Sequence, residues 1–118
     1  MSEQDPIVIV GSARTAMGGM QGDFSAVTAP QLGAAAIEAA LQRAGINGDD
    51  VDEVIMGNVL GAGQGQAPAR QASKGARIPD AVGATTINKM CGSGMKAAMF
   101  GHDLLVAGSA HVVVAGGM

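Results

Sequence analysis

Aromatic residues, cysteine and long apolar runs are all scarce in this 118-residue chain. It has two Phe and neither Trp nor Tyr, so its core must be built from aliphatic side chains and Met. A single Cys excludes an internal disulfide framework and a Cys-rich zinc site. No stretch approaches the roughly 18 apolar residues that a membrane-spanning helix needs.

Positive charge is also in short supply. Lys and Arg number 7 against 10 Asp and Glu, for a net charge of −3. With no basic face to meet a phosphate backbone and no Tyr or Trp to stack on bases, nucleic-acid binding is not expected. The N-terminal residues are acidic and lack the basic and apolar regions of a secretory signal. We therefore expect a cytoplasmic protein that binds neither nucleic acid nor membrane.

Apolar residues (47%) and 19 Gly dominate the composition, and strand-like and helix-like segments alternate. The predicted strands are 7–10, 54–60, 82–87 and 111–115, and the predicted helices are 29–44, 68–74 and 91–107. This alternation predicts an α/β fold, with a mostly parallel sheet and helices on both faces. The β-branched run 7–10 is typical of a strand buried on both faces. Because no helix follows the last strand to cover it, the chain resembles part of a larger fold.

The helix over 29–44 has clear start and stop signals. Thr28 is a suitable N-cap, Pro30 fits the first turn, and Gly45 fits a Schellman ending. We expect its packed stripe to be rich in alanine. The residues on that stripe are Leu32, Ala35, Ala36, Ala39, Ala40 and Arg43, with Ile37, Leu41 and Ala44 beside it.

Cys91 is the most informative residue. It follows a predicted strand and opens a predicted helix, and Gly92 and Gly94 leave its sulfur uncrowded. A helix N-terminus favours the thiolate, and the Cys91 backbone N–H is placed to help form an oxyanion hole. The residues alone leave three interpretations open: a nucleophile, an inert buried thiol and a redox-sensing thiol.

A cysteine nucleophile usually needs a base, and neither histidine is well placed to be one. His102 lies about three helical turns beyond Cys91, roughly 16 Å along the axis. His111 begins the last predicted strand, at the other end of the crossover from Cys91. We therefore expect both to be surface or packing residues.

Other candidate features are weaker. The glycines of 61–65 do not have the dinucleotide-binding spacing, and the acidic residues of 49–53 do not have the calcium-loop spacing. Arg70 and Lys74 lie one turn apart, which favours a contact between subunits over a solvated face. The methionines near Cys91 are expected to fill a core or an interface. These are Met90, Met95 and Met99.

Residues 85–97, Thr-Thr-Ile-Asn-Lys-Met-Cys-Gly-Ser-Gly-Met-Lys-Ala, closely resemble the active-site segment of thiolases, in the form typical of acetyl-CoA C-acetyltransferases. Four further segments match in the same order: 13–16, 53–60, 68–72 and 114–118. Ala67 stands where the family often has Asn, and Lys74-Gly75-Ala76 where Lys-Ala-Gly is commoner.

This resemblance implies a thiolase-like α/β fold, of which 1–118 would be an incomplete N-terminal domain fragment. The loop domain and the C-terminal half would lie outside it. The implied reaction joins two acetyl-CoA molecules into acetoacetyl-CoA and CoA, or reverses this by thiolysis, through an acetyl-Cys91 intermediate. CoA is the substrate carrier, and no metal or permanently bound cofactor is implied. The full subunit would be a homodimer or homotetramer.

The family's histidine and second cysteine would lie beyond residue 118, so the fragment alone is expected to be inactive. One alternative is an inactive thiolase-like fragment or interaction module that pairs with a thiolase-like partner. A second is a 3-ketoacyl-CoA thiolase of broader range. A relative of the ketoacyl synthases is disfavoured by the residues around Cys91.

Overall fold

Three short parallel strands in the order β2–β1–β3 form the sheet of the computed structural model, which describes residues 6–118. β1 is the central strand, and its Ile55 lies opposite Thr85 of β2 and Ala115 of β3. The elements are α1 (Ala29–Ala44), the 3-10 helix η1 (Gly48–Asp50), β1 (Glu53–Gly57), α2 (Pro68–Gly75), β2 (Gly83–Ile87), α3 (Ser93–Ala107) and β3 (Val113–Gly117).

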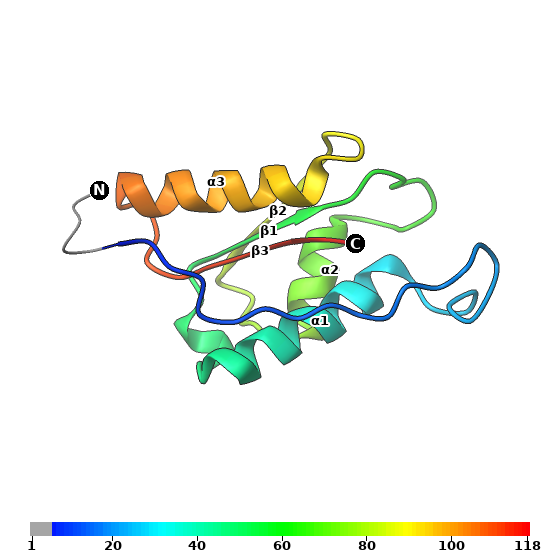
Figure 1. Cartoon of the computed structure of the whole chain (residues 1–118), viewed down its shortest axis with the longest axis horizontal. Helices are drawn as coiled ribbons and strands as arrows, with labels where there is room; N and C mark the ends of the chain where they lie inside the picture. Colours follow the sequence, from blue (N-terminus) through cyan, green and yellow to red (C-terminus); the bar gives the residue numbers. More distant parts are fainter. Residues whose placement is uncertain (1–5) are drawn as a thin grey trace.

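Helices cover both faces of this sheet, as the alternation predicted. α3 packs along one face, and α1 and α2 lie together on the other (Figure 1). The core lies between the sheet and the α1–α2 layer, and Val54 and Met56 are its buried centre. None of the helices in 6–118 is both long enough and apolar enough to cross a membrane.

The ends of α1 follow the predicted signals. The Thr28 hydroxyl accepts a hydrogen bond from the Gln31 N–H, and the Gln31 side chain accepts one from the Thr28 N–H. Gly45 is left-handed at φ 71°, and the Ile46 N–H bonds to the Leu41 carbonyl in the Schellman pattern.

The predicted alanine stripe of α1 is wrong. The buried residues are Pro30, Gly33, Ile37 and Leu41. This stripe contains a glycine because α1 packs closely on α2: a β-carbon at residue 33 would fall 3.3 Å from the Ala72 β-carbon. Close packing on a neighbouring helix, and not on a flat sheet, selects the face that is buried.

The predicted strand at 7–10 is also wrong. Residues 7–10 belong to no strand, and Val8, Ile9 and Val10 are exposed, Ile9 by 90%. A groove of about 600 Å³ is lined on one side by 7–13 and on the other by 112–117, with α1 and α3 at its walls. In Figure 1 the blue segment runs past β3 without joining the sheet. Its backbone has no neighbouring strand to pair with across that groove, so the apolar run is extended but unpaired.

Candidate active site

Cys91 lies in the turn that connects β2 to α3, at the carboxyl edge of the sheet. Its side chain is exposed, which excludes the interpretation of an inert core thiol for the described residues. The helix begins at Ser93, two residues later than predicted, so Cys91 precedes α3 and does not form its first turn. This placement leaves the thiol open to solvent next to the positive end of the helix dipole.

The turn holds Met90, the residue before Cys91, in the left-handed conformation at φ 48°. The Asn88 side-chain oxygen accepts a hydrogen bond of 2.9 Å from the Met90 N–H. The Ser93 hydroxyl accepts from the Lys89 N–H at 2.9 Å and donates to the Met90 carbonyl at 2.6 Å. Hydrogen bonds therefore fix the backbone on both sides of the left-handed residue.

Glycines let the start of α3 lie against the ends of β1 and β3. A β-carbon on Gly57 would fall 2.6 Å from the Ser93 β-carbon, and one on Gly117 would fall 3.3 Å from the Gly94 α-carbon. Side chains at these positions would push the helix, and the turn that carries Cys91, away from the sheet edge.

A network of amide side chains lies beside this turn, and sequence reasoning missed it. The Asn88 amide donates to the Val59 carbonyl at 3.4 Å. Asn58, 5% exposed, donates to the Gln64 side-chain oxygen at 3.0 Å. The Gln71 amide donates to the carbonyls of Gln64 and Gln66 at 2.8 and 2.7 Å. The available signal was the position of Asn58 and Asn88, each directly after a parallel strand, where loops build sites.

The two histidines lie away from the thiol, as predicted. The His102 Nδ1 is 3.3 Å from the Asp103 carboxylate on α3, and both side chains are largely exposed. His111 precedes β3, and its side chain is 90% exposed. In a parallel sheet the start of β3 and the end of β2 lie at opposite edges, so His111 and Cys91 are separated by the length of a strand.

Arg70 and Lys74 both have partners within the chain, and their contact with another subunit stays a prediction. The Arg70 guanidinium donates to the carbonyls of Asp80 and Val82 at 3.0 and 2.7 Å. Lys74 forms an exposed ion pair with Asp80 at 3.3 Å. Both cations fasten the segment before β2 to α2, because the chain reverses at 76–82 and brings its carbonyls back toward the helix.

Two carboxylates of the acidic segment have hydrogen-bond partners on the backbone. The Asp50 carboxylate accepts from the Asn47 N–H at 2.8 Å. Asp52 accepts from the N–H groups of His111 and Val112 at 2.7 and 3.0 Å, and these bonds, with a smaller effect of the His111 charge, lower the pKa of its carboxyl. Across residues 6–118, no three His, Cys, Asp or Glu side chains gather as metal ligands.

The methionines near Cys91 are exposed in this structure. Met90 is 65% exposed, Met95 75% and Met99 51%, so they are not part of the core of residues 6–118, and their place in an interface stays a prediction. The buried positions of α3 are the small residues Ser93, Ala97 and Gly101, which allow the helix to lie close to the sheet.

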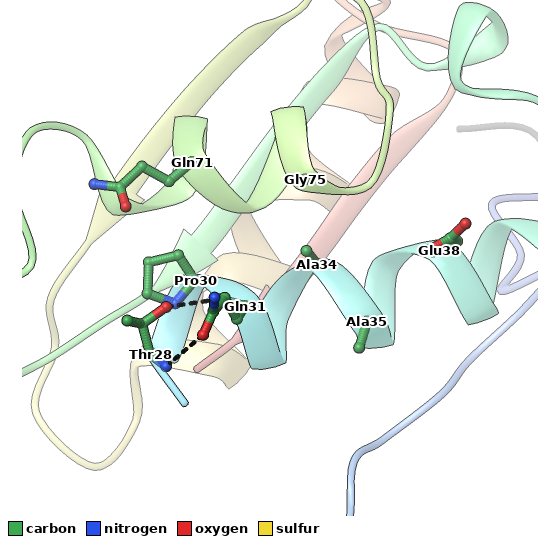
Figure 2. Close-up of a pocket in the computed structure, with 8 residues that line it drawn as sticks. All are labelled: Thr28, Pro30, Gln31, Ala34, Ala35, Glu38, Gln71 and Gly75. Atoms are coloured by element: carbon green, nitrogen blue, oxygen red, sulfur yellow. Dashed lines mark hydrogen bonds between the residues drawn. The ribbon is translucent and has the colours of Figure 1, made fainter. Parts of the chain in front are cut away.

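A second hollow, of about 570 Å³, lies between α1 and α2 and does not include Cys91 (Figure 2). It is lined by the capping box of α1 and by Gln71, and Glu38 is its one ionisable side chain among the described residues. With no nucleophile in its wall, this hollow has no part in the chemistry of the thiol.

Comparison with known proteins identifies the family of this chain. Residues 7–118 match the family described as Thiolase, N-terminal domain. The chain is 55% identical over 111 residues to the acetyl-CoA acetyltransferase of Cupriavidus necator, covering 94% of this chain and 28% of that protein. It is 50% identical over 117 residues to the cytosolic acetyl-CoA acetyltransferase of Gibberella zeae, covering 99% and 30%.

The fold is likewise similar to a solved thiolase. The Ascaris suum Acat5 thiolase, crystallised in complex with coenzyme A, superimposes with a TM-score of 0.91 at 36% identity, over 92% of this chain and 28% of that one. The chain thus spans less than a third of the length of these relatives. With its family match over 7–118 and the predicted motif at the turn before α3, the chain belongs to the thiolase family.

Proposed function

We propose that this chain supplies the nucleophile of an acetyl-CoA C-acetyltransferase, and that Cys91 is that nucleophile. The supporting observation is the exposed thiol at the carboxyl edge of a parallel sheet, in a glycine-lined turn before α3. The relatives from Cupriavidus necator and Gibberella zeae are named for this activity. The Ascaris suum thiolase was crystallised with coenzyme A, which supports a CoA thioester as substrate.

The reaction proceeds in two half-reactions that share a covalent intermediate. The Cys91 sulfur attacks the thioester carbonyl of acetyl-CoA, the carbon–sulfur bond to CoA breaks, and CoA leaves as the thiol with the proton taken from Cys91. A second acetyl-CoA then loses an α-proton to a base, and its carbanion attacks the acetyl carbon. Acetoacetyl-CoA forms, the bond to Cys91 breaks, and the sulfur regains a proton.

The proton transfers need groups that residues 6–118 do not bring to Cys91, since both described histidines lie elsewhere. We propose that the family's histidine and second cysteine supply them from a longer subunit, of which 1–118 is the N-terminal portion. The 118-residue chain alone is then not expected to turn over. We also propose that the full subunit is a homo-oligomer. We place it in the cytoplasm, because the relative from Gibberella zeae is described as cytosolic.

The direct test is acylation of the only thiol in the chain. The purified protein is incubated with acetyl-CoA, both as residues 1–118 and as the longest polypeptide in which this sequence is expressed. Intact-mass spectrometry then looks for one added acetyl group. We expect the longer polypeptide to be acetylated at Cys91, Cys91→Ser to abolish this, and Ser109→Ala, on an exposed serine far along the chain, to leave it unchanged.

Absence of acetylation in the longer polypeptide overturns the acyltransferase proposal. In that case, the alternative of an inactive thiolase-like module remains, and acetyl-CoA should not protect Cys91 from alkylation. Acylation with longer acyl-CoA esters at equal rates would instead favour a 3-ketoacyl-CoA thiolase of broader range. Light scattering of the longer polypeptide tests the oligomeric state.

A further inference from the structure

Ser93 is the one buried side chain in a turn whose other residues are exposed. It is 5% exposed, whereas residues 88–92 are all exposed. Its hydroxyl has both hydrogen-bonding roles filled, because it accepts from the Lys89 N–H and donates to the Met90 carbonyl. A serine at the first position of a helix ordinarily faces water, so its burial here needs an explanation.

These two hydrogen bonds lie on either side of the left-handed residue, one from the N–H of the preceding Lys89 and one to the carbonyl of Met90 itself. Met90 is at φ 48°, a conformation that residues other than Gly and Asn rarely adopt. Its carbonyl receives a second hydrogen bond, of 3.1 Å, from the Ser93 N–H. The Met90 carbonyl carbon is bonded to the nitrogen of Cys91, so fixing this carbonyl also fixes the direction in which the Cys91 backbone leaves the turn.

Ser93 also packs against the end of the central strand β1. Gly57, at the end of the central strand, lies so close that a β-carbon there would fall 2.6 Å from both the carbonyl carbon and the β-carbon of Ser93. The contacts therefore run without a gap from the buried strand β1 to Ser93, from Ser93 to Met90, and from Met90 to Cys91.

We propose that Ser93 is a positioning residue for Cys91: its hydroxyl keeps Met90 left-handed and thereby holds the thiol exposed over the start of α3. The role in acyl transfer rests on the proposed function, whereas the effect on the orientation of the thiol does not. Ser93 touches no substrate in this scheme and acts only through the turn.

The experiment measures the rate at which iodoacetamide alkylates Cys91 under native conditions in the 118-residue chain, whose single thiol makes the signal unambiguous. Ser93→Ala removes the hydroxyl and its hydrogen bonds to the turn. We expect the alkylation rate to fall about 3- to 10-fold, which is the rate ratio that corresponds to the free energy of one hydrogen bond. Ser93→Thr keeps a hydroxyl, and we expect it to recover most of that loss. Ser73→Ala is the matched control, because Ser73 is fully buried in α2 and its hydroxyl has no partner in the described residues.

Equal alkylation rates for the folded Ser93→Ala and wild-type chains overturn the proposal, since a merely structural serine changes stability without changing native-state reactivity. If circular dichroism shows that Ser93→Ala is unfolded, hydrogen exchange of the Lys89 amide in the wild-type chain decides instead. Protection of that amide supports the hydrogen bond from Lys89 to the Ser93 hydroxyl, and exchange at the rate of an unstructured peptide refutes the proposal.

Acyl transfer is measured separately, in the longest expressed polypeptide. We expect Ser93→Ala to lower kcat, or the single-turnover acylation rate, by about 3- to 10-fold with little change in KM. If acetyl-CoA does not acylate the wild-type protein but the alkylation rates differ as expected, the proposed function fails and the positioning role stands. If acylation proceeds equally in wild type and Ser93→Ala, the positioning role fails and the proposed function stands.

Discussion

Gly57 and Ser93 are in such close contact that a β-carbon on residue 57 would fall 2.6 Å from the Ser93 β-carbon. This joins the end of the central strand to the first residue of α3 without an intervening side chain. The turn that carries Cys91 is therefore set by the sheet, and the first prediction follows from that contact.

Gly57→Ala should destabilise the fold by about 1–3 kcal/mol, the usual cost of overpacking. The atoms that the new methyl group would meet include the Ser93 carbonyl carbon and the Gly94 nitrogen, which cannot rotate away as a side chain would. Gly61→Ala is the matched control, because its nearest non-neighbouring atom would be 3.9 Å away. Urea unfolding of both variants measures the difference. Equal midpoints would show that the first residues of α3 can move away from β1 at little cost in free energy, which would contradict the prediction.

Ala67 lies in a strained backbone conformation, with φ 47° and ψ 70°, just before α2. The left-handed region costs an L-residue about 1–2 kcal/mol, whereas Gly adopts it freely. The extra freedom of Gly in the unfolded chain costs about 0.4–1 kcal/mol. The difference predicts that Ala67→Gly stabilises the protein by roughly 0.5–1 kcal/mol, and that Ala67→Asn, which tolerates this region, also stabilises it.

The control for Ala67→Gly is Ala62→Gly in the same loop, because Ala62 is not left-handed. There the substitution only loosens the unfolded chain, so it should be neutral or destabilising. Urea unfolding of the two variants compares them directly. A stabilising effect at residue 62 equal to that at residue 67 would show that backbone strain is not the cause. The same strain gives a physical reason why Asn suits this position in related sequences.

Features set by neighbouring residues were predictable from the sequence, and features set by distant packing were not. Thr28 and Gly45 act within one turn of helix, and both bounds of α1 were predicted correctly. The order of strand, glycine-rich turn and helix around Cys91 was predicted correctly, but Cys91 was expected to open the helix, and α3 begins two residues later, at Ser93. The catalytic role of Cys91 stays a prediction.

Two of the errors involve partners that are remote in the sequence. The run 7–10 has strand-like residues, but a strand also needs a neighbour, and here a groove lies between this run and β3. The buried stripe of α1 depends on where α2 crosses it at Gly33. The subunit contact expected at Arg70 stays a prediction, but no pattern of side chains reveals that the carbonyls of Asp80 and Val82 return to Arg70.

Arg70 and Lys74 provide a prediction that separates a partly buried hydrogen-bonding cation from a surface ion pair. Arg70→Ala leaves the carbonyls of Asp80 and Val82 without their donor, and we expect a loss of about 1.5–3 kcal/mol, the range for hydrogen bonds to charged groups. Lys74→Ala breaks an ion pair whose side chains are 58% and 77% exposed, so its loss should stay below about 0.5 kcal/mol. Thermal or urea unfolding checks both, and equal losses would contradict the assignment of Arg70 to loop anchoring.

The last prediction concerns acid stability and depends on Asp52, which joins the starts of β1 and β3. Its carboxylate accepts hydrogen bonds from the His111 and Val112 N–H groups, and these bonds lower its pKa below the usual 3.8. Because the folded-state pKa lies below the unfolded value, the carboxylate stabilises the fold at pH values above 3.8. That contribution is lost as the pH falls through the folded-state pKa, where the group is protonated in both states.

Asp52→Asn removes this titration, since an amide has no acidic proton to bind. The variant should be less stable than wild type near pH 7, and the difference should shrink as the pH falls below 3.8 and through the folded-state pKa. Asp49→Asn is the control, because Asp49 accepts no side-chain hydrogen bond within residues 6–118, and its effect should not depend on the strand junction. Urea midpoints across this pH range measure both variants. A deficit of Asp52→Asn that does not shrink as the pH falls below 3.8 would show that the shape of the side chain, and not its charge, holds β1 to β3.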